Sequence, residues 1–315
     1  MCAIFGIIDY KNALSARAKE KILKVLSREC EVRGTDATGF AFNHGNHLTV
    51  YKRPLPAHKM NLHLPENVRV VMGHTRMTTQ GSEKLNYNNH PFSGNVEGHH
   101  FALAHNGVLY NDEEARLIYD LPSTGIQTDS YVAVQFIEKA GELNFDSLKF
   151  MAEKLIGSFV FTVLDNADNM YFVRGDNPLK IYHFYKHGFY LYASTEEILE
   201  KTLRKTGLSR LPKSEIKVEH GDILRIANDG NIDNDRFDIS YMYDDYFCLR
   251  WGKAATGFEI GQLKEFAGYF GYDESIIDEL IAEGYTVDEI EELLYEPDEL
   301  LLLCSDAVSV CEENL

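Results

Sequence analysis

Apolar and polar positions alternate in short runs through about the first 230 residues of this chain, a pattern typical of buried or half-buried β-strands. The segments DNADN (165–169) and KHG (186–188) separate such runs and are typical of hairpin turns. Runs rich in β-branched and aromatic residues are predicted to be strands at 3–9, 38–43, 47–52, 68–73, 101–105, 158–165, 170–174, 180–184, 189–194 and 222–226.

Helical spacing interrupts these strands at three places. Ser15 is a suitable N-cap for a helix whose apolar face holds Ile22, Leu23 and Leu26. Apolar residues repeat at helical spacing again over 145–155, and a third helix is expected to follow Thr128 and to end near Gly141. Strands, then helices, then strands again predict an α+β fold of antiparallel sheets covered by helices, rather than a doubly wound parallel sheet.

The chain changes character near its C-terminus. Three short amphipathic patterns, at 260–271, 273–284 and 286–296, predict a small all-α bundle, and the apolar segment 299–310 needs a surface on which to be buried. We therefore expect a domain over 1–236, a linker over 237–258 and a helical module over 259–315. The amphipathic patterns of this module favour a role in docking over a role in catalysis.

Charge separates the same two regions. The formal net charge is −18, and residues 259–315 hold 17 Asp and Glu against one Lys. This balance argues against nucleic-acid binding by the module.

No apolar run is long enough to cross a bilayer, and the start of the chain lacks the features of a secretory signal peptide, so a cytoplasmic protein is expected. Five scattered cysteines without CxxC spacing indicate free thiols rather than disulfides or a zinc ribbon.

Cys2 is the first candidate for chemistry, because removal of Met1 would place its thiol and a free α-amine on one residue. An α-amine has a pKa of about 7.7–8.0, so near neutral pH it can accept the proton of the thiol. The alternative is that Cys2 is a small buried apolar residue. It opens an apolar run, Ile4 to Ile8, that is expected to hold the terminus rigidly.

Asn106 and Gly107, in the segment HNG, offer a side-chain amide and a backbone N–H for an oxyanion hole. The alternative for this pair is a hairpin turn, since Asn-Gly is common in such turns. The segment by itself does not decide between an oxyanion hole and a hairpin turn.

Two charged residues suit the ends of an amino acid. Arg76 is expected in a loop, GHTRMTTQG, and its guanidinium is a natural partner for a carboxylate. Asp129, in TDS, can accept hydrogen bonds from an ammonium group, or Thr128 or Asp129 can cap the following helix. Together Arg76 and Asp129 describe a zwitterionic ligand.

Four histidines, His90, His99, His100 and His105, cluster in the sequence. Their spacing around a glycine-rich segment, without a Cys or acidic residue at ligand spacing, argues against a metal site. No metal is therefore expected.

The segments CAIFG, RGTDATG (33–39), GHTRMTTQG, NNHPF (88–92), AHNGVLYN and TDS, in this order, resemble the glutaminase domain of class II glutamine amidotransferases, a family that includes glucosamine-6-phosphate synthase and amidophosphoribosyltransferase. The resemblance covers roughly residues 2–230. It implies a four-layer αββα N-terminal-nucleophile (Ntn) hydrolase fold. The chain departs from the usual family residues at Ala3, Ala37, Met77 and Gln80, of which the last two belong to the loop that closes over glutamine.

The resemblance also implies residue roles. Cys2 would be the nucleophile, and Asn106 with Gly107 would form the oxyanion hole. Arg76, with Thr79 nearby, would bind the α-carboxylate of L-glutamine, and Asp129 its α-ammonium. Arg33 and Gly34 would position the terminal amine.

The sequence thus predicts hydrolysis of the glutamine side-chain amide through a Cys2 thioester, with no cofactor. The ammonia is expected to pass to a separate partner enzyme that docks on residues 259–315. The alternatives are a stand-alone glutaminase or another Ntn amidase, and a non-catalytic interaction protein on the same fold. The oligomeric state is left open.

Overall fold

The computed structural model of the chain describes residues 2–45, 47–239, 257–285, 287–295 and 300. The chain divides into two compact units, Met1–Tyr246 and Phe247–Leu315. Most of the expected linker (237–258) and of the apolar segment 299–310 lies outside the described residues.

The first unit contains two antiparallel sheets. Seven strands form the first sheet, in the order β11-β9-β10-β1-β4-β2-β3. Their bounds are β1 Ala3–Ile8, β2 Ala37–His44, β3 His47–Arg53, β4 Val70–Arg76, β9 Lys180–Phe184, β10 Phe189–Ala193 and β11 Ser214–Ile216. The strand that follows Cys2 lies in the middle of this sheet, between β10 and β4.

Six strands form the second sheet, in the order β13-β12-β8-β7-β6-β5. Their bounds are β5 Phe92–Val96, β6 His99–Leu109, β7 Gly157–Asp165, β8 Met170–Arg174, β12 Asp222–Ile226 and β13 Ile232–Arg236. β6 pairs with β7 along its length, whereas its pairing with β5 ends at Leu103. The end of β6 that carries Asn106 is therefore paired with β7 on one side and is not paired with β5 on the other.

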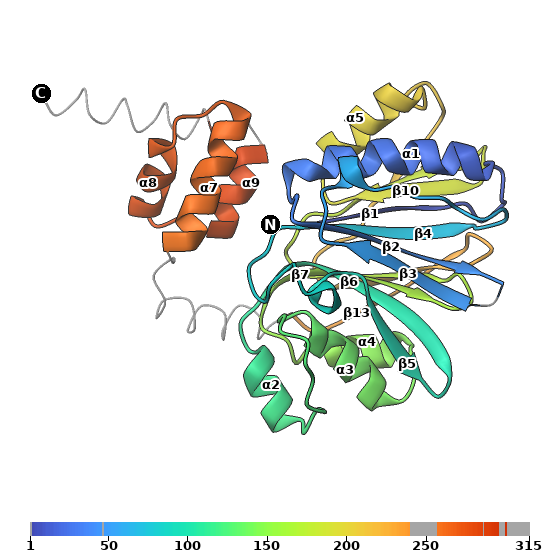
Figure 1. Cartoon of the computed structure of the whole chain (residues 1–315), viewed down its shortest axis with the longest axis horizontal. Coiled ribbons are helices and arrows are strands. Elements are labelled where there is room, and N and C mark those ends of the chain that lie inside the picture. The colour runs from blue at the N-terminus through green and yellow to red at the C-terminus, as the bar shows by residue number, and fades with distance from the viewer. Residues whose placement is uncertain (1, 46, 240–256, 286, 296–299, 301–315) are drawn as a thin grey trace, which may run out of the picture. The chain divides into compact units, whose positions relative to one another are not determined.

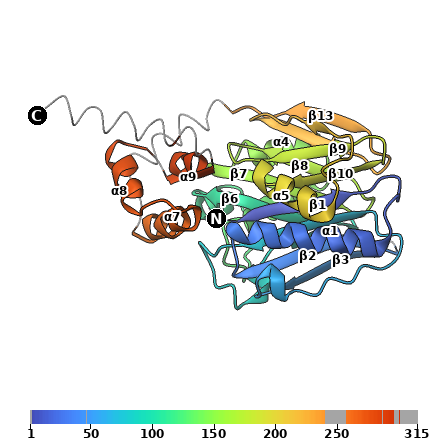
Figure 2. The same ribbon diagram turned by 90° about the horizontal axis from the view of Figure 1, so that it is seen from above.

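Helices cover the outer face of each sheet. The helices α1 (Ala16–Glu29) and α5 (Glu196–Thr206) lie side by side on the first sheet, and α3 (Tyr131–Ala140) and α4 (Phe145–Ala152) lie on the second (Figures 1 and 2). A separate apolar core fills the space between the sheets, with residues such as Ile4, Ala104 and Val160. The four-layer αββα sandwich expected from the sequence is confirmed.

Local signals explain where these helices begin and end. Ser15 caps α1, its hydroxyl accepting a hydrogen bond from the backbone N–H of Ala18 at 3.2 Å. The helices α3 and α5 end at Gly141 and Gly207, both in the left-handed conformation that glycine adopts most readily. Shorter helices are α2 (Asp112–Ile118) and the 3-10 turns η1 (Cys30–Val32), η2 (Ala57–Lys59) and η3 (Asn86–Asn88).

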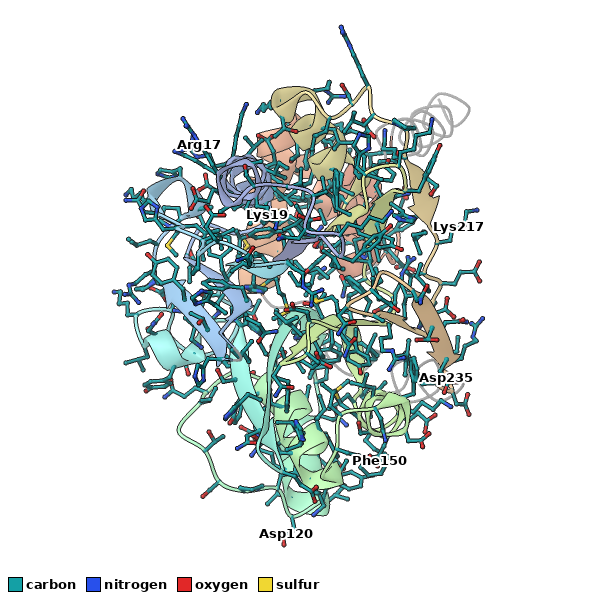
Figure 3. All side chains as sticks on the ribbon, turned by 90° about the vertical axis from the view of Figure 1, so that its right-hand side faces the viewer. Arg17, Lys19, Asp120, Phe150, Lys217 and Asp235 are labelled. Carbon is teal, nitrogen blue, oxygen red and sulfur yellow. The ribbon has the colours of Figure 1, made fainter. Side chains whose placement is uncertain are left out.

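Charged residues of α1 take opposite positions. Arg17 projects into solvent, whereas Lys19 points toward the sheets (Figure 3). Lys19 Nζ lies 2.9 Å from the Asp9 carboxylate and donates to the carbonyl oxygen of Val68 at 2.6 Å. This buried ion pair attaches α1 to the ends of the strands beneath it.

The second unit contains α7 (Gly257–Phe270), α8 (Ser275–Ala282) and α9 (Val287–Tyr295). These helices coincide with the three amphipathic patterns of the sequence. Apolar side chains that are buried within the unit include Leu263, Ala267, Ile277, Leu280 and Leu294. No helix among the described residues is both long and apolar enough to span a bilayer.

Candidate active site

Cys2 lies at the entrance to β1, so a fully buried central strand fixes its position. Its side chain is 9% exposed, and its thiol donates to the carbonyl oxygen of Met77 at 3.6 Å. Burial raises the pKa of the thiol, although the Met77 hydrogen bond and the Arg76 charge act against this rise. The thiol is therefore protonated near neutral pH, and a nucleophilic reaction needs a base that accepts its proton.

Arg33 joins Cys2 to Asn106 across the space between the sheets. It follows η1, is 1% exposed, and donates from Nε to the Cys2 carbonyl oxygen at 2.8 Å. Its Nη2 donates to Asn106 Oδ1 at 3.4 Å. A guanidinium has only donors, so this contact identifies the Asn106 atom that faces it as the oxygen.

The remaining half of the Asn106 amide is the most informative group of the site. Asn106 Nδ2 is buried and has no hydrogen-bond partner among the residues that the structure describes. Buried amide groups nearly always have partners, because an unsatisfied donor costs about 1–3 kcal/mol. This donor is thus available for an acceptor that the protein does not supply.

Gly107 lies within a strand, so the alternative of a hairpin turn at HNG is wrong. β6 continues to Leu109, and Gly107 pairs with Phe159 of β7. Its φ angle is +140°, and an added Cβ would lie 1.9 Å from the Ser158 carbonyl oxygen. The position therefore requires glycine.

Arg76 is the last residue of β4 rather than part of a loop, as the sequence had suggested. Its Nη1 donates to Asn89 Oδ1 at 2.7 Å, and its Nη2 donates to the carbonyl oxygens of Gln80 at 2.5 Å and Gly81 at 3.0 Å. The backbone of Gln80 makes this contact, so the departure from the usual family residue at this position leaves the contact intact. Asn89 is a site neighbour that sequence reasoning did not single out.

Gly34 packs directly against the peptide that follows Arg76. A Cβ at Gly34 would lie 2.4 Å from the Arg76 carbonyl carbon and 2.5 Å from the Met77 nitrogen. This close approach explains the glycine, since any side chain would displace the segment that carries both Arg76 and the Met77 carbonyl.

Thr79 is exposed in the segment after β4. The adjacent Thr78 is more buried: its N–H donates to Asp36 Oδ2 at 2.7 Å, and its hydroxyl has no partner among the described residues. Thr78 is a polar group of this segment that sequence reasoning passed over.

Asp129 is buried beside the end of β6. Its Oδ2 accepts from the Leu109 N–H at 2.7 Å, and its Oδ1 accepts from the Ser130 hydroxyl at 3.1 Å. One alternative for Asp129 was that its side chain caps the following helix. The N-cap residue of α3 is Ser130, and the observed contacts of the Asp129 side chain do not include a helix cap. The charge of Arg76 lowers the pKa of the Cys2 thiol, whereas that of Asp129 raises it.

The four histidines separate into two groups. His99 and His100 are exposed at the start of β6, whereas His90 and His105 are buried. His90 packs against a further buried histidine, His74, with ring centroids 4.2 Å apart. Burial lowers the pKa of His74 to about 3 and that of His90 well below its usual value, so both rings are neutral.

No family model matches the chain. Over 190 residues, it is 32% identical to glutamine–fructose-6-phosphate aminotransferase (isomerizing) of Staphylococcus epidermidis, a match that covers 58% of this chain and 30% of the relative. The Staphylococcus aureus enzyme of that name is 32% identical over 188 residues, covering 57% and 30%. The chain thus matches less than a third of the length of these curated relatives.

The fold is similar to that of solved enzyme structures. The glutamine phosphoribosylpyrophosphate amidotransferase from B. subtilis superposes with a TM-score of 0.59 at 21% identity, over 76% of this chain and 50% of that one. A second structure, described as the allosteric regulatory enzyme of purine biosynthesis, gives a TM-score of 0.59 at 20% identity, again over 76% and 50%. In sequence, this chain is therefore similar to part of the glutamine–fructose-6-phosphate aminotransferases, and in fold it is similar to the glutamine phosphoribosylpyrophosphate amidotransferase.

Proposed function

We propose that this protein hydrolyses the side-chain amide of L-glutamine, with Cys2 as nucleophile after Met1 has been removed. The observation that carries the proposal is the buried Asn106 Nδ2, which is without a partner among the described residues and is joined to Cys2 through Arg33. A buried donor that Arg33 links to the nucleophilic residue suits a carbonyl oxygen that gains negative charge during the reaction.

The reaction begins when the Cys2 α-amine accepts the thiol proton and sulfur adds to the amide carbon. The carbonyl π electrons move to oxygen, where the Asn106 amide and the Gly107 N–H would stabilise the charge. Collapse of this intermediate breaks the C–N bond, and the ammonium form of the α-amine protonates the departing nitrogen as ammonia. Water then attacks the γ-glutamyl thioester, the amine accepts its proton, and glutamate leaves as the thiol is restored.

Arg76 and Asp129 have the charges that the two ends of glutamine require. The guanidinium would bind the α-carboxylate, with Thr79 nearby, and the carboxylate of Asp129 would bind the α-ammonium. A substrate without this zwitterion would need neither residue, which favours glutamine over a general amidase substrate. Arg33 and Gly34 would hold the terminal residue and the Arg76 segment in place. No cofactor enters this scheme.

We further propose that the ammonia passes to a separate enzyme that docks on residues 259–315. This segment is rich in acidic residues and forms helices in a compact unit of its own, while the site residues lie in the other unit. We also propose a cytoplasmic location, since the free thiols of Cys2 and Cys30 suit a reducing compartment.

Labelling tests the catalytic proposal. The native protein is incubated with a diazoketone analogue of glutamine, and its intact mass is measured. We expect loss of Met1 and one adduct, which is absent in Cys2→Ala. A protein that has lost Met1 but never takes up the label would contradict the mechanism and would favour the non-catalytic alternative.

A further inference from the structure

Ser130 does not cap its helix in the way that its position suggests. It is the N-cap residue of α3, where a serine hydroxyl normally accepts a hydrogen bond from the N–H groups of the first turn. Here its side chain makes no cap hydrogen bond. The hydroxyl lies instead 3.1 Å from Asp129 Oδ1 and 2.8 Å from His105 Nδ1.

His105 is held rigidly behind this hydroxyl. Its ring stacks on Phe161 with centroids 4.6 Å apart, and its Nε2 lies 3.3 Å from the Ser158 carbonyl oxygen. The backbone oxygen of His105 also accepts a hydrogen bond from His74 Nε2 at 3.0 Å. A buried chain of contacts therefore leads from β7 through His105 and Ser130 to Asp129.

The number of available protons determines which group donates and which accepts in these contacts. Burial lowers the pKa of His105, so the ring is neutral and has one N–H. The Ser130 hydroxyl also has one proton, which the negative charge of Asp129 attracts. Both hydrogen bonds form together when His105 Nδ1–H donates to Ser130 and Ser130 donates to Asp129. In this tautomer Nε2 has no proton, so its 3.3 Å approach to the Ser158 carbonyl oxygen is not a hydrogen bond, and the shorter 2.8 Å contact with Ser130 is the one that is formed.

We infer that Ser130 and His105 are positioning residues that hold the Asp129 carboxylate in the orientation needed to recognise the α-ammonium group of the substrate. The Leu109 N–H fixes one carboxylate oxygen, and the His105–Ser130 pair fixes the other. The carboxylate cannot rotate without breaking one of these contacts, so its remaining lone pairs keep one direction. The inference rests on the proposed role of Asp129.

Comparison of two substrates tests this inference. Glutaramate is glutamine without the α-amine, so the ratio of kcat/KM for glutamine to that for glutaramate reports ammonium recognition. In the full-length protein, with Met1 removal verified by mass, Ser130→Ala should raise the KM for glutamine about tenfold, with kcat changed less than about threefold. It should lower the substrate ratio by a similar factor. Ser130→Thr, which keeps the hydroxyl, should restore the ratio.

Two further variants separate this inference from the proposed function. Asp129→Asn should abolish the preference for glutamine, and His105→Phe, which keeps a ring on Phe161, should reduce it even if Ser130→Ala fails to fold. If Asp129→Asn keeps the preference, the proposed role of Asp129 fails, and the inference with it. If Asp129→Asn loses the preference while Ser130→Ala and His105→Phe keep it, only the positioning role is overturned.

Discussion

Asn106 shows how one neighbour can define the function of a side chain. An amide carries both a donor and an acceptor, and in isolation either end can face a substrate. Arg33 takes the acceptor end, so the NH₂ group is the part that remains for a ligand. The proposed oxyanion site therefore depends on a residue that is 73 positions away in the sequence.

Replacement of Asn106 should affect the rate far more than substrate binding. Loss of one oxyanion donor typically costs about 10²–10³ in kcat, so we expect this loss in Asn106→Ala with little change in KM. Steady-state measurement of ammonia release checks the prediction. The isosteric Asn106→Asp should be at least as impaired, because it replaces the donor with an acceptor. An unchanged kcat in both variants would remove Asn106 from the mechanism.

The contacts of Ser130 and His105 are likewise interactions of individual side chains. Sequence reasoning did not single out Ser130, whose hydroxyl contacts His105 of β6 and the preceding Asp129 in the folded chain. Asn89 is a similar case, since its contact with Arg76 appears only in the folded chain.

At the scale of elements, β6 carries both residues of the proposed oxyanion site, Asn106 and Gly107. Its alternation directs Ala104 toward the core between the sheets and Leu103 toward the helices. Asn106 shares the face of Ala104, which is how it meets Arg33. The strand was predicted to end at His105, because Asn-Gly is a turn signal, but pairing with β7 carries it on to Leu109.

Gly107 and Gly125 provide a matched pair of substitutions. Gly107→Ala should lower the free energy of unfolding by about 1–3 kcal/mol and reduce activity, because its φ of +140° and the Ser158 carbonyl leave no room for a Cβ. A Cβ at Gly125 would meet no atom within 4 Å, so Gly125→Ala should be nearly neutral. Urea unfolding measures both. Equal stability of the two variants would contradict the described geometry at Gly107.

Other elements escaped prediction for identifiable reasons. β13 consists mostly of charged and polar residues and forms a strand because β12 offers it a hydrogen-bonding edge. β11 has three residues, too few to show alternation, and β5 (FSGNV) places Ser, Gly and Asn between its two strand-forming residues. The helix α5 did have a sequence signal: Thr195 caps it, Ile198, Leu199 and Leu203 share its buried face, and Gly207 ends it.

At the scale of the whole molecule, the residues of the candidate site lie in the unit Met1–Tyr246. That unit has its own core between the sheets and beneath each helical layer. The acidic helices lie in the other unit and have a separate set of buried apolar residues.

A chain that ends at Tyr246 should separate the two proposed activities. Compact units often fold alone, so we expect kcat/KM for glutamine to stay within about twofold of the full chain. Pull-downs from a native extract should recover the ammonia-accepting enzyme with the full chain and lose it with the shortened one. Equal recovery by both forms would count against docking through residues 259–315.

The sequence by itself determined the strand-rich domain, the three C-terminal helices, the α+β class and the identity of the chemical groups at Cys2, Arg76, Asn106 and Asp129. These follow from periodicity and side-chain chemistry, which are local properties of the chain. Tertiary structure alone decided which of these groups have partners. Hydrogen bonds between residues distant in the chain occupy one end of Asn106 and organise Arg76 through Asn89, and the contact with His105, 25 positions away, engages the Ser130 hydroxyl in place of a helix cap.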